Sequence, residues 1–219
     1  MHVSHNNTQE HRGFAPGDKS ELFIPYDIDG NDWSKNFYPL VGYVSAGLSS
    51  AQAKFGPQSL FCPVSSGGAN YGNVPVNMMT DDFCVEAWVY PTNTQTYAVV
   101  VAKYSTSSGW AMRLNSRRIA WYSYGPNISL YNGGSTQAPL NQWSHIAVTR
   151  RINTIRLFMN GTISTQGTMS GVTATADPVM VGIQNGWPTR GFIGYIDNVR
   201  VSIDHYRYSA PFTPPNRQY

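Results

Sequence analysis

The sequence predicts an all-β fold, a sandwich or barrel of short antiparallel strands, and three observations support it. Aromatic residues make up 13% of the 219 residues and charged residues only 12%, while 20 Gly and 14 Pro supply many turns. From residue 21 onward apolar residues recur with a period of two, which is typical of strands. No window longer than about two turns has the period of an amphipathic helix. The length suits one domain, and short helical turns are allowed only near residues 51–54 and 204–208.

Residues 83–91 and 97–104 give the clearest strand signals. In FCVEAWVYP (83–91) the odd positions up to Val89 are apolar and predict a core-facing side, which leaves Glu86 on the outward side. Pro91 then ends the strand. YAVVVAKY (97–104) is a continuous apolar run with a β-branched centre, so we expect it to be buried on both faces.

Further strands follow along the chain, and two of them form a predicted hairpin. TIRLFMNGTIST (154–165) alternates on both sides of Asn160-Gly161, a pair that accepts the positive φ angles of a tight primed turn. In FIGYIDNVRVS (192–202) the period of two groups Asp197 with Val199 on one face. The remaining predicted strands are 110–115, 118–124 and 143–150.

The chain is predicted to divide into a flexible N-terminal arm, residues 1–20, and a β-sandwich domain, residues 21–219. The arm is polar and nearly free of large apolar residues. The sequence has neither a basic-then-apolar leader nor a run approaching 18 apolar residues, so we expect no secretory signal and no membrane span. Cys62 and Cys84 are expected to be buried free thiols in a reducing cytosol, although one bridge between them stays open.

Charge is uneven along the chain, although the net charge of +3 by itself implies no nucleic-acid partner. Residues 1–86 carry nine acids and four bases, or −5, and residues 87–219 carry three acids and eleven bases, or +8. The interleaved strands of a sandwich turn this asymmetry into local patches. Two candidate patches are Arg113, Arg117 and Arg118, and Arg150, Arg151 and Arg156; the favoured interpretation is that both solvate outward strand faces.

The chain resembles the laminin-G-like, concanavalin A-like lectin/glucanase superfamily, and most closely its members in bacteriophage virion proteins. Five segments carry the likeness in order: FCVEAWVYP, WSHIAVTR, TIRLFMNG, FIGYIDNVRVS and HYRYSAPFTPP. ELFIPYDIDGNDWS also resembles the family's opening strand and acidic turn. The likeness covers about residues 21–215 and implies a two-sheet antiparallel jelly-roll sandwich. Arg151-Ile152-Asn153 and Trp33 depart from the family pattern, so ligand specificity does not carry over.

The resemblance includes glucanases, yet the sequence predicts no enzymatic activity. Those enzymes place paired carboxylates on one strand with the spacing E-x-D-x-x-E, because alternation then brings the acid and the nucleophile to one face. Glu86 lies on a suitable strand, but Trp88 and Pro91 occupy the two positions where the other acids would stand. The sequence also has no G-x-S-x-G or H-E-x-x-H motif.

The turn DIDGND (27–32) is rich in the oxygen ligands that calcium prefers. The resemblance implies a structural calcium held by Asp29 or Asp32 together with Asp197 on the last long strand. The favoured alternative is a solvated turn and an Asp197 that accepts hydrogen bonds from backbone amides, because the ligand count is low. No other cofactor is expected.

Aromatic rings suggest a carbohydrate site, since sandwiches of this kind stack rings on sugar faces and use polar side chains for hydroxyls. Trp187 lies in the predicted loop QNGWP and is the best candidate for an exposed ring. Any single ring is more often core than site. The full set of candidate ligand-binding residues is Trp187, Trp121, Tyr122, Tyr124, Trp110 and Arg118.

The sequence favours a non-enzymatic phage virion surface protein, either a capsid decoration protein or a tail fibre or adhesion component. A chain without a leader folds inside a cell, whereas lectin-like sandwiches usually act outside it, and a virion assembled in the host cytoplasm satisfies both conditions. Expected partners are other virion proteins and a host-surface glycan, with a homo-oligomer left open. The alternatives are a free carbohydrate-binding module or lectin and, third, an endo-glucanase.

Overall fold

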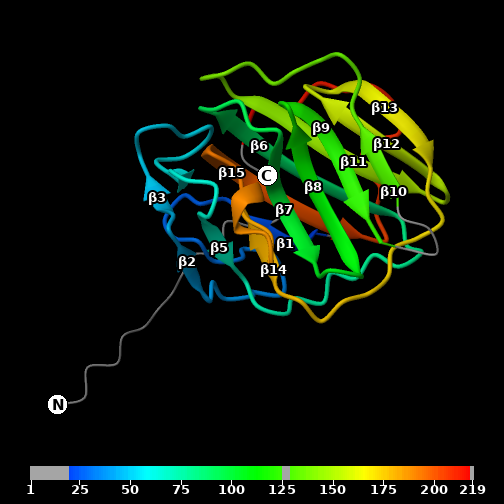
Figure 1. Ribbon diagram of the computed structural model, residues 1–219, viewed down its shortest axis with the longest axis horizontal. Coiled ribbons are helices and arrows are strands. Elements are labelled where there is room, and N and C mark those ends of the chain that lie inside the picture. The colour runs from blue at the N-terminus through cyan, green and yellow to red at the C-terminus, as the bar shows by residue number, and fades with distance from the viewer. Residues whose placement is uncertain (1–19, 125–128, 218–219) are drawn as a thin grey trace.

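The computed structural model describes residues 20–124 and 129–217, which form a sandwich of two antiparallel sheets (Figure 1). The all-β jelly-roll prediction is confirmed. The predicted arm lies outside the described residues except for Ser20, which is already the first residue of strand β1. Within the described ranges the one helical element is the 3-10 turn η1 (Pro188–Arg190), so no helix forms near residues 51–54 or 204–208.

The two sheets contain eight and seven strands. The eight-stranded sheet has the order β13 (Thr162–Thr168), β12 (Thr154–Met159), β11 (Ser144–Arg151), β6 (Phe83–Pro91), β15 (Gly194–Ile203), β4 (Ser59–Cys62) and β3 (Gly47–Ser49), and β1 (Ser20–Ile24) also pairs with β15. The seven-stranded sheet has the order β10 (Ser129–Asn132), β9 (Arg118–Ser123), β8 (Gly109–Asn115), β7 (Tyr97–Tyr104), β14 (Val179–Val181), β5 (Gly68–Asn70) and β2 (Gly42–Val44).

The core lies between the sheets and is built by the predicted alternation. Phe83 and its odd-numbered neighbours in β6 point inward and are fully buried. From the facing sheet, Trp110 and Trp121 stack with their ring centroids 5.5 Å apart. Phe83 stacks on Trp121 at 5.1 Å, so rings from both sheets meet in the centre of the sandwich.

Strand β15 departs from the predicted period of two at Asp197. The register shifts between Asp197 and Arg200, and Asn198 has a φ of 48°. Because this bulge adds a residue, Ile196 and Val199 both face the core, and the predicted grouping of Asp197 with Val199 is wrong. The bulge turns the Asp197 carboxylate toward the loop that contains Lys54, whose N–H it accepts at 2.8 Å.

The predicted hairpin between β12 and β13 is confirmed. Asn160 has a φ of 49° and Gly161 a φ of 77°, the positive angles that a tight primed turn needs. The Phe212 N–H donates to the Gly161 carbonyl at 3.0 Å, and a Cβ at Gly161 would collide with the Phe212 carbonyl oxygen. Gly161 therefore serves both the turn and the C-terminal segment (residues 204–217) that passes beside it.

Two of the six patch arginines are buried, so the interpretation that both patches solvate outward faces is wrong for them. Arg150 is 2% exposed, and Arg113, on β8, is 5% exposed. The Arg150 guanidinium donates to backbone carbonyls on two loops, including those of Asp81 at 2.7 Å and Met169 at 3.1 Å. Cys62 and Cys84 are free and buried as predicted, and burial raises the pKa of Cys62 to about 12.

Candidate functional site

The outer face of the seven-stranded sheet has a floor of small residues. Val99 and Ala102 of β7, Ala111 of β8 and Ala120 of β9 lie on this side, and the register pairs Ala102 with Ala111. All four are buried although they face away from the main core, because larger side chains of the same face cover them. This arrangement accounts for the burial of residues 98–104 on both faces, whereas Tyr97, which was expected to be buried with them, is 41% exposed.

Three tyrosines stand over one end of this floor. The ring centroids of Tyr104, Tyr122 and Tyr124 lie between 5.5 and 5.7 Å from one another. Tyr104 is buried and packs with the floor, whereas Tyr122 and Tyr124 are half-buried. The exposed parts of Tyr122 and Tyr124 are therefore available to a ligand.

Two arginines lie between aromatic rings over the other end of the floor. The guanidinium carbon of Arg113 is 5.0 Å from the ring centroid of Tyr122 and 5.3 Å from that of Tyr97. The guanidinium carbon of Arg190 is 5.2 Å from the centroid of Tyr97 and 4.0 Å from that of Trp187. These are cation–π distances, and Tyr97 is shared by both arginines. Rings and guanidinium groups thus form one continuous cluster.

Trp187 and Arg190 come from the loop after β14, which is fastened to the sheet beside them. Gly191 forms an isolated parallel bridge with Val99, and its N–H donates to the Ser65 carbonyl at 2.9 Å. A Cβ on Gly191 would lie 2.1 Å from the Ser65 oxygen, so a glycine is required for this close approach. The bridge to β7 holds Arg190 against Tyr97.

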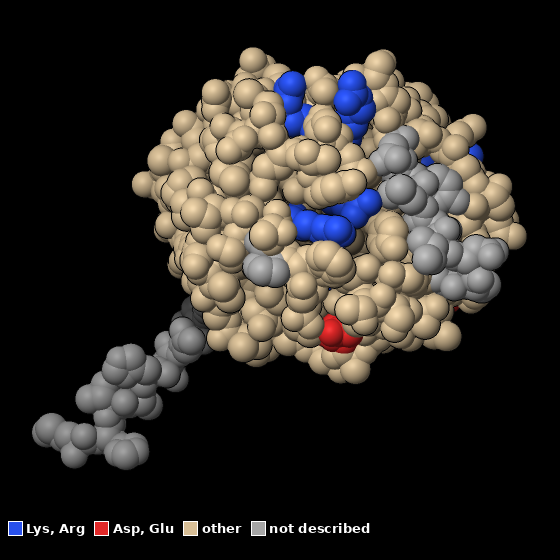
Figure 2. All heavy atoms as spheres, viewed as in Figure 1, with Lys and Arg blue, Asp and Glu red and all other residues tan. Residues whose placement is uncertain are grey.

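This face carries positive charge without a carboxylate on its strands. No Asp or Glu occurs between Glu86 and Asp177, and none occurs in any strand of the seven-stranded sheet. Figure 2 shows Lys and Arg atoms in the middle of the face, set in a hollow between ridges of uncharged residues. In that view the acidic atoms of the described residues appear near the lower edge, away from the hollow.

The predicted ligand-binding residues divide between this face and the core. Tyr122 and Tyr124 lie on the face, and Trp187 is 37% exposed at its border. Arg118 is the first residue of β9 and lies on the same side as Ala120, because side chains two residues apart in a strand point the same way. Trp110 and Trp121 do not belong to the site, because both are buried in the core stack. The sequence analysis missed Arg190 and predicted that Arg113 faces solvent. The absence of Asp and Glu between Glu86 and Asp177 was a sequence signal that could have indicated a positively charged face.

The three predicted calcium ligands already accept hydrogen bonds. Asp32 is buried and accepts three backbone N–H groups, and Asp29 accepts the backbone N–H of Asn31. Asp197 accepts hydrogen bonds from backbone N–H groups, as the alternative to calcium binding predicted. Burial outweighs these hydrogen bonds, and the net effect raises the pKa of Asp197 to about 7. Among the described residues no group of three or more His, Cys, Asp or Glu side chains is arranged to hold a metal. Calcium binding stays a prediction.

Glu86 is a buried structural residue on the outer face of the eight-stranded sheet. It accepts hydrogen bonds from Nε of Arg200 at 2.7 Å and from the hydroxyl of Tyr208 at 2.8 Å, and it contacts Nε2 of His145 at 3.2 Å. Burial alone would raise its pKa, but Arg200, His145 and Arg207 outweigh burial and hold the pKa of Glu86 well below its usual range. A carboxyl that stays ionised is not a proton donor.

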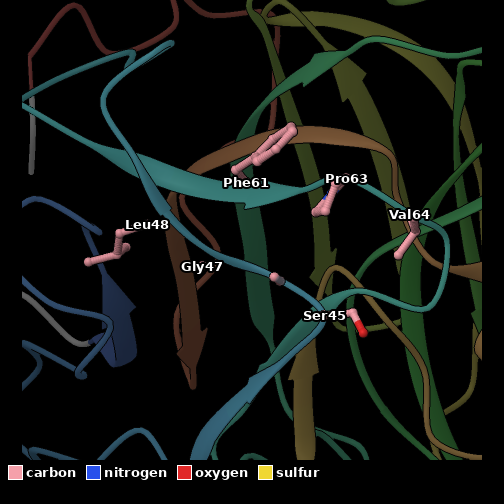
Figure 3. Close-up of a pocket in the computed structure, with 7 residues that line it drawn as sticks. Ser45, Gly47, Leu48, Phe61, Pro63 and Val64 are labelled. Atoms are coloured by element: carbon pink, nitrogen blue, oxygen red, sulfur yellow. The ribbon is translucent and has the colours of Figure 1, made fainter.

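A second hollow lies at the edge of the eight-stranded sheet, beside β3 and β4. It is shallow, has a volume of about 540 Å³, and is lined mainly by apolar side chains, among them Leu48, Phe61 and Val64. Figure 3 shows these side chains spread along neighbouring chain segments rather than converging on one point. Its lining contains no charged residue, so it offers little to a hydroxyl-rich ligand.

The chain belongs to the concanavalin A-like lectin/glucanases superfamily, whose sequence model matches residues 66–204. This confirms the family part of the resemblance. No curated protein sequence gives a significant match. The described residues contain no helix long and apolar enough to cross a membrane.

Similar solved structures share the fold at low sequence identity. Domain 4 of AbnA, a GH43 extracellular arabinanase from Geobacillus stearothermophilus solved with arabinotriose, has a TM-score of 0.68 and 17% identity, covering 84% of this chain and 92% of that one. The binding domain of botulinum neurotoxin serotype G gives 0.59 and 15%, covering 89% and 48%. The receptor binding domain of botulinum neurotoxin D gives 0.60 and 12%, covering 89% and 50%. The chain spans about half the length of these toxin domains.

Proposed function

We propose that the protein binds carbohydrate without catalysis through the tyrosine–arginine face, the cluster of rings and guanidinium groups on the outer side of the seven-stranded sheet. The continuous cluster of rings and guanidinium groups carries the proposal, because sugars stack on aromatic faces and hydrogen-bond to planar donors. The AbnA domain, which has the same fold, was solved with an oligosaccharide. The face consists of Tyr97, Tyr122, Tyr124, Trp187, Arg113 and Arg190.

The composition of the face supports binding rather than hydrolysis. Glycoside hydrolysis normally needs two carboxyl groups about 5–10 Å apart across the scissile bond. The strands of the seven-stranded sheet contain no Asp or Glu. Glu86, on the opposite sheet, is buried and bonded to Arg200 and Tyr208.

We expect Tyr122→Ala and Trp187→Ala each to weaken saccharide binding by about tenfold or more, since each removes a stacking surface. The measurement is binding of the purified chain to a panel of immobilised neutral and acidic oligosaccharides. Phe37→Ala is the matched control, because Phe37 is 52% exposed and lies in the loop after β1. Unchanged binding in both variants, at unchanged melting temperature, would refute the assignment of the face.

We further propose that the domain is carried on a phage particle, as a decoration protein or a tail component, and that residues 1–19 attach it. The likeness of five ordered segments to virion proteins supports this proposal. The deletion should stop before Ser20, whose Oγ accepts a hydrogen bond from Arg207 at 3.1 Å. We expect the shortened chain to keep its melting temperature and to lose retention on particles that lack the native copy. Retention equal to that of the full chain would contradict this attachment.

A further inference from the structure

Arg113 is a buried cation for which the described residues show no ion pair. Arg113 is 5% exposed, and within the described part of the chain its Nε has no hydrogen-bond partner. Its neighbours are the ring faces of Tyr97 and Tyr122, which attract the charge but accept no strong hydrogen bond. Burial and the nearby charge of Arg190 lower its pKa. A buried guanidinium is costly unless an acceptor compensates it.

Arg190 adds a second positive charge at the same place. It shares the Tyr97 ring with Arg113 and lies over Trp187 on its other side. The strands beneath supply no Asp or Glu, so the sheet does not compensate either charge. Each guanidinium group presents a planar fork of N–H donors, which is suited to a bidentate contact with a carboxylate.

We infer that the tyrosine–arginine face takes an acidic saccharide, with the sugar carboxylate bound by Arg113 and Arg190. The sugar ring then stacks on an adjoining aromatic side chain, Tyr122 or Trp187. This inference rests on the proposed function and adds the chemical class of the ligand. A neutral sugar offers Arg113 only hydroxyl acceptors, whereas a carboxylate supplies a charged acceptor that pairs with both arms of the guanidinium.

The arrangement does not suit an extended polyanion. Nucleic acid is bound by rows of cations that track its backbone. Here only two guanidinium groups, those of Arg113 and Arg190, share the Tyr97 ring, and Arg113 is almost wholly covered. The geometry is that of a single anionic group bound beside a ring.

The test is isothermal titration of the full chain with two acidic saccharides and their neutral counterparts. Trigalacturonate is compared with its methyl ester, and sialyllactose with lactose, so that the two sources of a sugar carboxylate are separated. We expect at least one acidic ligand to bind about 10–100-fold more tightly than its neutral counterpart. Arg113→Met should abolish this preference, so that the acidic ligand and its neutral counterpart bind with equal affinity.

Two further variants keep the test decisive. Arg113→Lys retains the charge but loses the planar fork, so it should keep the melting temperature and lose most of the preference. If Arg113→Met does not fold, Arg113→Lys alone decides. Arg156→Met removes a half-buried arginine from β12 of the other sheet and should change nothing.

The outcomes separate the inference from the proposed function. Equal binding of acidic and neutral saccharides, lost in Tyr122→Ala, would overturn the acidic class and leave carbohydrate binding intact. Absence of binding to every saccharide would overturn both proposals.

Discussion

Glu86→Gln is expected to destabilise the sandwich by about 3–5 kcal/mol, the usual cost of removing one partner from a buried ion pair. Glutamine keeps the shape of the side chain but removes the charge that compensates two arginines. Arg200 is almost fully buried and loses a charged acceptor, and Arg207, at 3.5 Å, loses an ion pair. The Tyr208 contact that holds the C-terminal segment is weakened as well. Urea unfolding measures the change.

The pH dependence gives this prediction a second signature. The pKa of Glu86 is lower in the folded protein than in the unfolded chain. At a pH between these two values the unfolded chain binds more protons, so the contribution of Glu86 to the free energy of unfolding is lost as the pH falls. The difference in unfolding free energy between the protein and Glu86→Gln should be full at neutral pH and shrink below about pH 4. The raised pKa of Asp197 changes stability with pH in the opposite direction, but Asp197 is present in both the unchanged protein and Glu86→Gln, so its effect cancels in the difference.

Glu21→Gln is the matched control for Glu86→Gln. Glu21 pairs with Lys35 at 3.0 Å, but their side chains are 28% and 60% exposed, so the pair should contribute less than about 1 kcal/mol. A loss of stability in Glu86→Gln no larger than in Glu21→Gln would show that the buried pair does not hold the sheet and the C-terminal segment together.

Arg150→Met is expected to cost roughly 2–4 kcal/mol, because it leaves several partly buried carbonyl groups without a donor. The guanidinium of Arg150 donates to four backbone carbonyls and to the side chain of Asn153. The four carbonyls belong to the loop before β6 and the segment after β13, so one side chain ties two distant loops to β11. The measurement is again the free energy of unfolding in urea.

Arg156→Met serves as its control and should stay within about 0.5 kcal/mol of the unchanged protein. Arg156 lies on β12 and is half-buried, unlike the almost fully buried Arg150. Equal effects of the two substitutions would mean that the carbonyl contacts of Arg150 are replaced by water at little cost.

Strands with a clean local signal were predictable from the sequence. β6 and β7 have the predicted bounds, because Pro91 ends one strand and a β-branched run defines the other. β14 was missed, because three residues are too few to show a period. The bulge at Asp197 was also missed, since it depends on pairing with β6, which is distant in the sequence.

The site was only partly predictable, because alternation separates two faces without saying which one is buried. Trp121 and Tyr122 are neighbours with large rings, and only the packing of Trp121 against Phe83 decides that Trp121 faces the core. Arg190 reaches Tyr97 only through the bridge between Gly191 and β7, which no local pattern reveals. The fold therefore followed from local periodicity, whereas the site required contacts between distant segments.

The most direct test of the central claim is an NMR titration of the full chain with the tightest-binding acidic saccharide. We expect the side-chain signals of Arg113 and the indole signal of Trp187 to shift with the ligand, because both residues line the tyrosine–arginine face. The indole signals of Trp110 and Trp121, which lie in the core, should stay in place. Saturable binding that leaves Arg113 and Trp187 unmoved, and shifts residues of the edge hollow such as Phe61 instead, would contradict the central claim.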